Sequence, residues 1–515
     1  MHFASRSRKN SRLHFLAETR SYPLLLVTMR TKLDFLLWIC FFVLFVACED
    51  HPQEPDIVAV TSVTLNESAL SLKEGRNVTL SATITPDDAT NQNVTWKSSD
   101  PNIATVDANG KIRALKPGTA TITVITEDGE KTATCTVTVE PGDPLKSSRT
   151  VLVYVAADNT LSGFASLDFE EMKVGMAKVE DVDVNFLVYI DKGGSPQLLE
   201  LKNENGTVIE KVVKTYSSRN SVGVSETQEV FAAVFSNTQY QADSYGLVYW
   251  SHGDGWLPYP LGANTRWVGQ DIGNGDKRMN ISEFVEILET APHFDFILFD
   301  ACFMQSVEVA YELRNYTDYC IGSPTEIPGP GASYDELVPA MFFSEDAAVD
   351  IAKAYYEPYA AKYDEGNGIS NTNWTGGASV CALRTEPLVD LAVFTKQILP
   401  GTVDNASLRK SVFDYDKRRG SDGYQDGHVG YYDLVGMMRM ITDDNAYEAW
   451  KQIFNSAVAY WATTSMNYSS YVGMFSMEGT NGVSCYIPST SNTATDKAYR
   501  STEWYTSAGF EKLGW

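Results

Sequence analysis

Four runs of continuous apolar residues constrain the fold of this chain most strongly. A run without polar alternation predicts a strand buried on both faces, as in a parallel sheet between two helix layers. In residues 164–179 and 306–313, apolar residues recur at the spacing of a helix. We therefore expect an α/β/α sandwich with a mostly parallel sheet over residues 150–515. The four runs are TVLVYVA (150–156), VNFLVYI (184–190), YGLVYW (245–250) and FDFILF (294–299).

Chemically active side chains follow two of these runs. His252-Gly253 comes just after YGLVYW, and Asp300-Ala301-Cys302 comes directly after FDFILF. Active sites in such sheets lie beyond the carboxyl ends of the strands, so neighbouring strands would bring the imidazole and the thiol to one rim. An imidazole can take the proton of an attacking thiol and return it to a leaving amine. The Gly253 N–H is a candidate oxyanion donor.

Other readings of these positions remain open. Cys302 or His252 taken singly is more often a packing or turn residue, and only their matching positions favour catalysis. His293 precedes its strand, so we expect it at the opposite rim. His428 lies in a loop rich in Gly and Asp and is the reserve candidate for the imidazole.

The segment from Ile57 to about Glu140 has a different pattern. Short alternating Val, Thr and Ile runs separated by turn signals predict a small all-β sandwich, with Trp96 and Cys135 in its core. The string from Trp96 to Val124 resembles a bacterial group 2 immunoglobulin-like domain. We expect this domain at 57–141 and a linker at 142–149. A spacer role is favoured over binding of carbohydrate or protein.

The amino-terminal stretch has the order of an export signal. Arg30 and Lys32 precede an apolar run at 35–47, which is shorter than the roughly 20 residues of a membrane-spanning helix. Leu44 to Cys48 resembles a bacterial lipobox, which implies lipidation of Cys48. We expect a leader at 1–47 with its true start at Met29, then a lipidated tether at 48–56. This places the chain at the bacterial cell envelope, anchored to the outer membrane and facing the periplasm or the cell surface; an uncleaved anchor helix is the alternative.

The charge balance excludes one class of partner. Lys and Arg number 41 against 66 Asp and Glu, a net charge of −25. So negative a chain argues against nucleic-acid binding and fits attraction of cationic substrates. The sequence contains no phosphate loop, dinucleotide fingerprint or HExxH helix, which argues against a kinase, a dehydrogenase and a zinc protease.

The His-Gly and Asp-Ala-Cys pair resembles the motifs of caspase-like peptidases, and residues 148–515 resemble the clostripain family of cysteine peptidases. Supporting strings are VLVYVAADNTL, FDACFMQSVEVAYEL, GSPTEIPGPGASYDEL, YYDLVGMM and GVSCYIP. The resemblance implies an endopeptidase with a caspase-like fold, His252 as general acid and base, and Cys302 as nucleophile. It also implies protein or peptide substrates cleaved after Arg or Lys. The chemistry requires no cofactor.

Carboxylates near the nucleophile offer a physical basis for that preference. Asp300 lies two residues before Cys302, and we expect it to pair with substrate Arg or Lys, bidentately with Arg. The alternative is that Asp300 caps the following helix. Glu326 and Asp335 in the next strand-end loop are possible additions to the pocket.

Processing and calcium are further expectations taken from relatives. Arg266 follows a flexible-looking Gly-Ala-Asn-Thr stretch and is the candidate self-cleavage site. The stretch from Asn274 to Glu283 has part of an EF-hand spacing, but Lys277 occupies the place of the required Gly. A turn before a helix at 281–289 is the favoured interpretation. A structural calcium ion is possible, without assigned ligands.

Two other functions stay open. One is a cell-surface adhesin or binding protein on an inactive peptidase scaffold, although an inactive site has no chemical reason to keep both His252 and Cys302. The other is a transpeptidase or amide hydrolase of the same class, because water and amines attack the same thioester.

Overall fold

In the computed structural model, the described residues are 58–73, 77–141, 147–179, 183–256, 267–342, 347–363, 374–417, 428, 430–489 and 494–515. The expected leader, the candidate lipidation site Cys48 and the candidate cleavage site Arg266 lie outside these ranges. Within them, no helix combines the length and the apolar character that a membrane crossing requires.

The amino-terminal domain is the expected all-β sandwich. Cys135 is fully buried in its core, and Trp96 packs partly buried against the same core. The alternating burial of β9 explains why every second residue there is apolar. One sheet has the order β2 (Ala69–Lys73), β9 (Thr132–Glu140), β8 (Gly118–Thr126), β5 (Val94–Ser98); a second has the order β3 (Asn77–Thr79), β7 (Lys111–Ala114), β6 (Ala104–Val106); and β1 (Ser62–Leu65) pairs with β4 (Ala82–Thr85).

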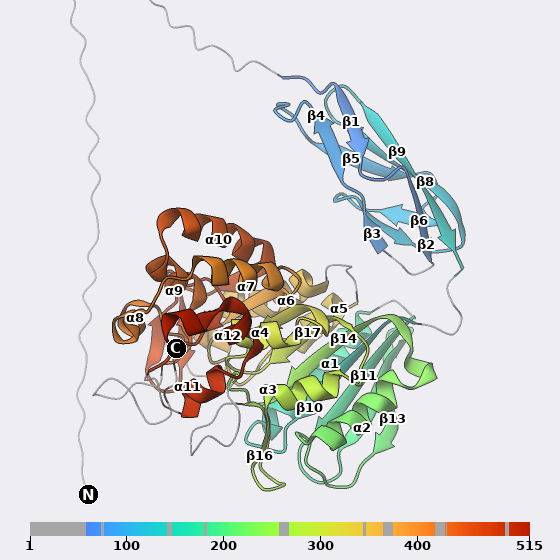
Figure 1. Cartoon of the computed structure of the whole chain (residues 1–515). Helices are drawn as coiled ribbons and strands as arrows, with labels where there is room; N and C mark the ends of the chain where they lie inside the picture. Colours follow the sequence, from blue (N-terminus) through green and yellow to red (C-terminus); the bar gives the residue numbers. More distant parts are fainter. Residues whose placement is uncertain are drawn as a thin grey trace, which may run out of the picture. The chain divides into compact units, whose positions relative to one another are not determined.

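A nine-stranded mixed sheet forms the centre of the large domain (Figure 1). Its five middle strands are parallel, whereas the pairings at both edges are antiparallel. The strand order is β13 (Thr207–Thr215), β12 (Gln197–Glu204), β11 (Val184–Asp191), β10 (Ser147–Ala156), β14 (Ala242–Trp250), β17 (Phe294–Asp300), β18 (Thr317–Gly322), β19 (Ser379–Arg384), β21 (Val458–Thr463).

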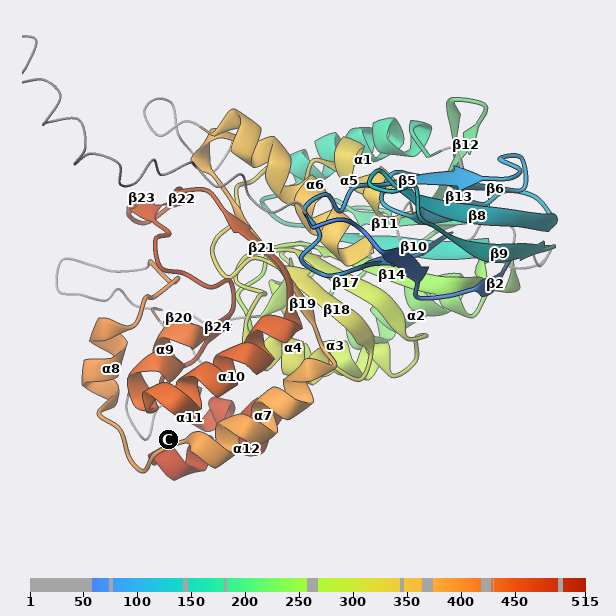
Figure 2. The same cartoon turned by 90° about the horizontal axis from the view of Figure 1, so that it is seen from above.

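Helices cover both faces of this sheet, which confirms the expected sandwich (Figure 2). Alternate residues of β10 enter different cores: Leu152 and Tyr154 point to one layer, and Val151 and Val153 to the other. One layer consists of α1 (Ser162–Ala177), α5 (Tyr334–Ala340) and α6 (Ala347–Lys362). The other contains α2 (Val224–Phe235), α3 (Ile281–Leu288), α4 (Val307–Leu313), α7 (Pro387–Ile398), α10 (Asp444–Ala457) and α12 (Glu503–Ala508).

Smaller elements surround the carboxyl edge of the sheet. They are the hairpins β15 (Val268–Asp271) with β16 (Lys277–Met279) and β22 (Met466–Ser469) with β23 (Gly473–Ser476), the pair β20 (Tyr432–Asp433) with β24 (Ser484–Cys485), and the helices α8 (Asn405–Ser411), α9 (Leu434–Ile441) and α11 (Ala494–Tyr499).

The four predicted strands are neighbours in the middle of the sheet. The sequence analysis did not identify β18, which completes the parallel set, or the antiparallel strands β12, β13, β19 and β21. β13 is largely exposed, and Glu210, Lys211 and Lys214 interrupt its apolar residues, so it lacks a continuous apolar run. The helix expected at 306–313 begins after Ser306, whose side-chain oxygen accepts the Val309 N–H at 3.2 Å. The turn expected before α3 is also present, closed by a capping box between Asn280 and Glu283.

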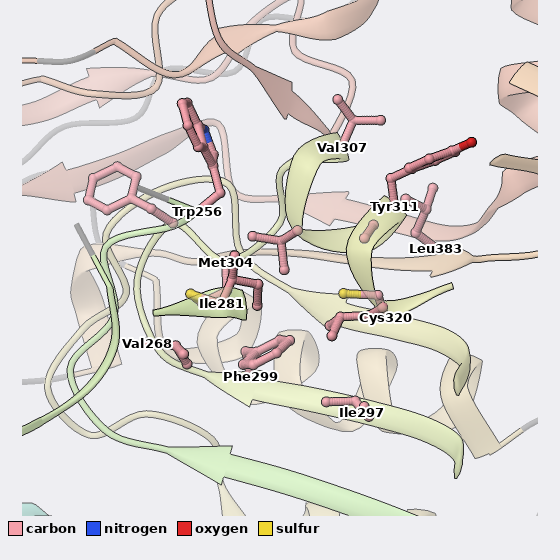
Figure 3. Packing of buried hydrophobic residues seen from close by; sticks show 14 of the residues in the cluster. Trp256, Val268, Ile281, Ile297, Phe299, Met304, Val307, Tyr311, Cys320 and Leu383 are labelled. Atoms are coloured by element: carbon pink, nitrogen blue, oxygen red, sulfur yellow. The ribbon is translucent and has the colours of Figure 1, made fainter. Parts of the chain in front are cut away.

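A tightly packed aromatic and aliphatic core supports the two strands that lead to the strand-end motifs (Figure 3). Phe299 is 1% exposed, and its ring lies 5.6 Å from that of Phe284 and 6.5 Å from that of Tyr249. Met304 and Val307 continue this core into α4. The residues on either side of Cys302 are therefore held by buried packing rather than by a free loop.

Removing one of these rings tests the packing. We expect Phe299→Ala to lower the free energy of unfolding by about 3–5 kcal/mol, because it leaves a cavity in a core that relaxes only partly. Leu167→Ala, at a side chain that is 62% exposed, is the control and should change stability by less than about 0.5 kcal/mol. Urea unfolding followed by tryptophan fluorescence measures both; equal midpoints would contradict the packing argument.

Candidate active site

The register of two neighbouring strands brings the predicted pair together. β14 and β17 are parallel neighbours, and Trp250 is aligned with Asp300. His252 and Cys302 each follow two residues after this aligned pair, so they leave the sheet at the same level. Both line one cavity of about 380 Å³. The condition on which the sequence argument depended, that the two strands are adjacent, is met.

Cys302 is partly exposed and faces this cavity. Its Sγ accepts the Ile327 N–H at 3.3 Å. Burial raises the pKa of the Cys302 thiol to about 12, and the negative charge of Glu326 adds to the rise. Near pH 7 the side chain of Cys302 is therefore a thiol rather than a thiolate.

The residue after Cys302 has an unusual backbone conformation. Phe303 has φ of +61°, a region that costs a bulky side chain on the order of 1 kcal/mol or more. Its N–H donates to the Thr325 carbonyl at 3.0 Å, and its ring stacks on Tyr431 at 5.3 Å. These contacts hold the turn that presents Cys302 to the cavity.

The imidazole of His252 is oriented by a residue that the sequence analysis did not single out. Its Nε2 lies 2.8 Å from Thr160 Oγ1, and the Trp267 ring packs edge-on at 6.4 Å. Burial lowers the pKa of His252, while the nearby Asp254 opposes the shift. The imidazole is therefore neutral near pH 7 and able to accept a proton. Thr160 follows β10, so applying the strand-end rule to that third strand would have found it.

Gly253 occupies a place with no room for a side chain. A Cβ at this position would lie 2.7 Å from the Ala301 Cβ and 2.9 Å from the Cys302 carbonyl oxygen. The adjoining amide of Asp254 donates to the Trp267 carbonyl at 2.7 Å, but the Gly253 N–H has no partner within the described residues. That amide lies beside Cys302, with no hydrogen-bond acceptor for it in the part of the chain that the structure describes.

Asp300 lies almost buried at the cavity wall, with 2% of its surface exposed. Its Oδ2 accepts the Ala332 N–H and the Tyr334 hydroxyl, each at 3.0 Å, and its Oδ1 accepts the Tyr355 hydroxyl at 2.9 Å. Burial raises the pKa of Asp300, whereas these donors lower it. Asp300 does not cap the following helix, because Ser306 has that role.

The two further carboxylates have different positions. Glu326 lines the cavity, and its oxygens accept the N–H and the hydroxyl of Ser470 at 2.9 and 3.1 Å, which fastens the β22–β23 hairpin beside the site. Asp335 is not among the residues that line this cavity. Its carboxylate accepts the Ser333 hydroxyl at 2.8 Å and lies 3.5 Å from Lys178. Asp335 is displaced because it belongs to the first turn of α5.

Neither of the other two histidines joins the site. His293 lies directly before β17, at the amino end of the strand, and contacts Asp318 at 2.8 Å. His428 contacts Asp414 at 2.7 Å and is not among the residues that line the cavity.

Within the described residues, no group of three His, Cys, Asp or Glu side chains is arranged to hold a metal ion. In the partial EF-hand stretch, Glu283 accepts the Asn280 N–H at 2.7 Å, and Asp276 contacts Arg278 at 3.1 Å. These oxygens are already used within the protein, so this stretch does not fit a calcium loop.

Comparison with known proteins places both domains. Residues 59–137 match the model of the bacterial Ig-like domain (group 2), and residues 153–513 match that of the clostripain family. A secreted C11 cysteine protease from Bacteroides thetaiotaomicron, solved with an irreversible peptide inhibitor, is 48% identical with a TM-score of 0.64. The match covers 71% of this chain and 99% of that one. An inactive zymogen C11 protease from Parabacteroides distasonis is 30% identical with a TM-score of 0.59, over 71% and 99% of the two chains.

Matches to curated proteins are shorter. An uncharacterized protein of Clostridium acetobutylicum is 42% identical over 22% of this chain, and an α-L-arabinofuranosidase of Bifidobacterium longum is 47% identical over 17%. This chain spans only 12% and 8% of the lengths of those two proteins. Clostripain of Hathewaya histolytica is 24% identical over 36% of this chain and 41% of its own length. From the family match over residues 153–513 and the cavity shared by His252 and Cys302, we conclude that this chain belongs to the clostripain family of cysteine peptidases.

Proposed function

We propose that this protein is a lipid-anchored, extracytoplasmic cysteine endopeptidase that cleaves after Arg or Lys with His252 and Cys302 as its catalytic pair. The observation that carries the proposal is the aligned register of β14 and β17, which opens both side chains into one cavity. The adjacent, buried carboxylate of Asp300 supports the preference for basic substrates.

The reaction begins from a neutral pair, because the pKa of Cys302 is raised and that of His252 is lowered. Since Thr160 engages Nε2, the nitrogen left to act as base is Nδ1. As Sγ attacks the scissile carbonyl carbon, its proton passes to this nitrogen. The imidazolium then protonates the leaving amine, and water hydrolyses the resulting thioester with the imidazole as base.

The charge that develops on the carbonyl oxygen needs hydrogen-bond donors. The unused N–H of Gly253 is one donor, and a preorganised amide of this kind is typically worth about 10²–10³ in kcat. The glycine is required there sterically, since a side chain would collide with Ala301 and with the Cys302 backbone.

The location is proposed from the sequence of the leader and from two relatives. The run at 35–47 followed by Cys48 has the features of a lipoprotein signal. Two structural neighbours from Bacteroides thetaiotaomicron are described as secreted C11 cysteine proteases. We therefore place the peptidase domain outside the cytoplasm, tethered to the outer membrane through Cys48.

Substitutions of the catalytic pair test the mechanism. We expect Cys302→Ala to abolish peptide hydrolysis, because no other nucleophile replaces the sulfur. His252→Ala should lower kcat by about 10²–10⁴, the usual contribution of general acid–base catalysis. The control is Cys320→Ala, which removes a fully buried thiol away from the cavity and should keep the activity of its folded fraction. Turnover of a fluorogenic peptide measures all three, and full activity of Cys302→Ala would refute the mechanism.

Matched peptides that differ only before the scissile bond test specificity. We expect cleavage of Arg and Lys peptides and little cleavage of Ala peptides. Asp300→Asn should lower kcat/KM for the basic peptides by about 10²-fold or more, because the buried cation loses its counter-charge. Asp335→Asn is the matched control, since this carboxylate is not among the residues that line the cavity and its loss should leave kcat/KM for these peptides unchanged. Equal cleavage of Ala and Arg peptides would reject the proposed preference.

Self-cleavage after Arg266 is part of the same proposal. A preference for basic residues makes this position a substrate for the enzyme itself. We expect purified wild type to separate into two fragments on a denaturing gel, whereas Arg266→Ala and Cys302→Ala stay intact. A single intact wild-type band identical to that of Cys302→Ala would exclude self-cleavage.

A further inference from the structure

The carboxylate of Asp300 has few acceptor positions left for a ligand. Oδ2 accepts two hydrogen bonds, from the Ala332 N–H and the Tyr334 hydroxyl, and Oδ1 accepts one from the Tyr355 hydroxyl. An ionised carboxylate has about four acceptor positions, two on each oxygen. One position therefore remains, on Oδ1. Because Asp300 lines the cavity, this position is the one available to a bound side chain.

The three groups that donate to the Asp300 carboxylate, one amide and two hydroxyls, carry no charge. The neighbouring carboxyl group of Asp168 is neutral as well. Asp168 accepts the Trp250 indole N–H at 2.8 Å, and burial, followed by the charge of Asp300, raises the pKa of Asp168 to about 9. Asp168 is thus protonated near pH 7 and leaves Asp300 as the main negative charge. The other titratable groups that face Asp300 are Glu171 on α1, Tyr359 on α6 and Cys302.

Glu171 helps to hold Tyr334 in position, although it does not contact Asp300 by a hydrogen bond. Burial raises its pKa, and its Oε2 accepts the Tyr334 N–H at 3.1 Å, so it fixes the start of α5. Within the described residues, no Lys or Arg side chain bonds to Asp300. The anion is stabilised only by one amide and two phenolic hydroxyl groups until a substrate cation arrives.

We propose that Tyr334 and Tyr355 are positioning residues for the basic side chain of the substrate: they hold Asp300 as an anion with one open acceptor toward the cavity. The site then takes a single N–H from the cation. A guanidinium cannot use both carboxylate oxygens there, so Arg loses the bidentate advantage that it usually has over Lys. This inference rests on the proposed preference for basic substrates and adds that Lys and Arg are accepted alike.

The arrangement also sets a pH dependence. Only ionised Asp300 binds the cation, and burial holds its pKa above the ordinary value while the two hydroxyl groups lower it. The kcat/KM for a basic peptide therefore rises with pH through the pKa of Asp300. Removing either hydroxyl raises this pKa further and moves the rise to higher pH.

The experiment compares kcat/KM against pH for matched Lys and Arg peptides in wild type, Tyr334→Phe and Tyr355→Phe. We expect wild type to cleave the two peptides within about tenfold of each other. Each Phe variant should lose at least about tenfold at the acidic end of the profile, because a hydrogen bond to a charged group is removed, and should recover as the pH rises. The control is Tyr359→Phe, whose fully buried hydroxyl donates to the Gly331 carbonyl at 2.7 Å instead of to the carboxylate. It should keep the wild-type midpoint.

Three results would contradict the proposed role of the tyrosines or the function on which it rests. An Arg preference above about tenfold would contradict the single open acceptor. Midpoints of Tyr334→Phe and Tyr355→Phe equal to that of Tyr359→Phe would overturn the positioning role. Wild type that cleaves Ala peptides as well as Lys peptides would instead reject the proposed function. Urea unfolding of each variant, followed by tryptophan fluorescence, measures whether it is folded under the assay conditions, so loss of folding is separated from loss of binding.

Discussion

The parallel pairing of β14 with β17 is the constraint on which the geometry of the site depends. Trp250 and Asp300 are aligned across this pair, and His252 and Cys302 follow two residues later on each strand. Buried packing fixes the pairing, because Phe299 and its aromatic neighbours fill one face of these strands. A shift of one residue would turn each apolar side chain to the opposite face, so the hydrophobic core and the active site are specified together.

Burial disfavours the charged form of each of three titratable groups at the site. It keeps the thiol of Cys302 and the imidazole of His252 neutral. It also disfavours the anion of Asp300, which Tyr334, Tyr355 and an amide offset by hydrogen bonding. The same cavity therefore contains a neutral thiol and a neutral imidazole and, beside them, a carboxylate stabilised by hydrogen bonds.

The elements that complete the site come from distant parts of the chain. Thr160 follows β10, and its hydroxyl orients the imidazole of His252, while Ser470 belongs to a hairpin fastened by Glu326. Membership in the clostripain family accounts for the shared fold and the cysteine chemistry. The positions of Thr160 and the two tyrosines follow from this chain's own hydrogen bonds.

By itself, the sequence determined the all-β domain, the four central strands and the positions of His252 and Cys302 after two of them, because buried strands leave continuous apolar runs. It also determined family membership through motifs that are local in the chain. Only the tertiary structure decided that Thr160 meets His252, that Tyr334 and Tyr355 enclose Asp300, and that Asp335 points away to Lys178. These contacts join residues up to 157 positions apart in the sequence. A local sequence pattern does not show which distant side chain will donate or accept a given hydrogen bond.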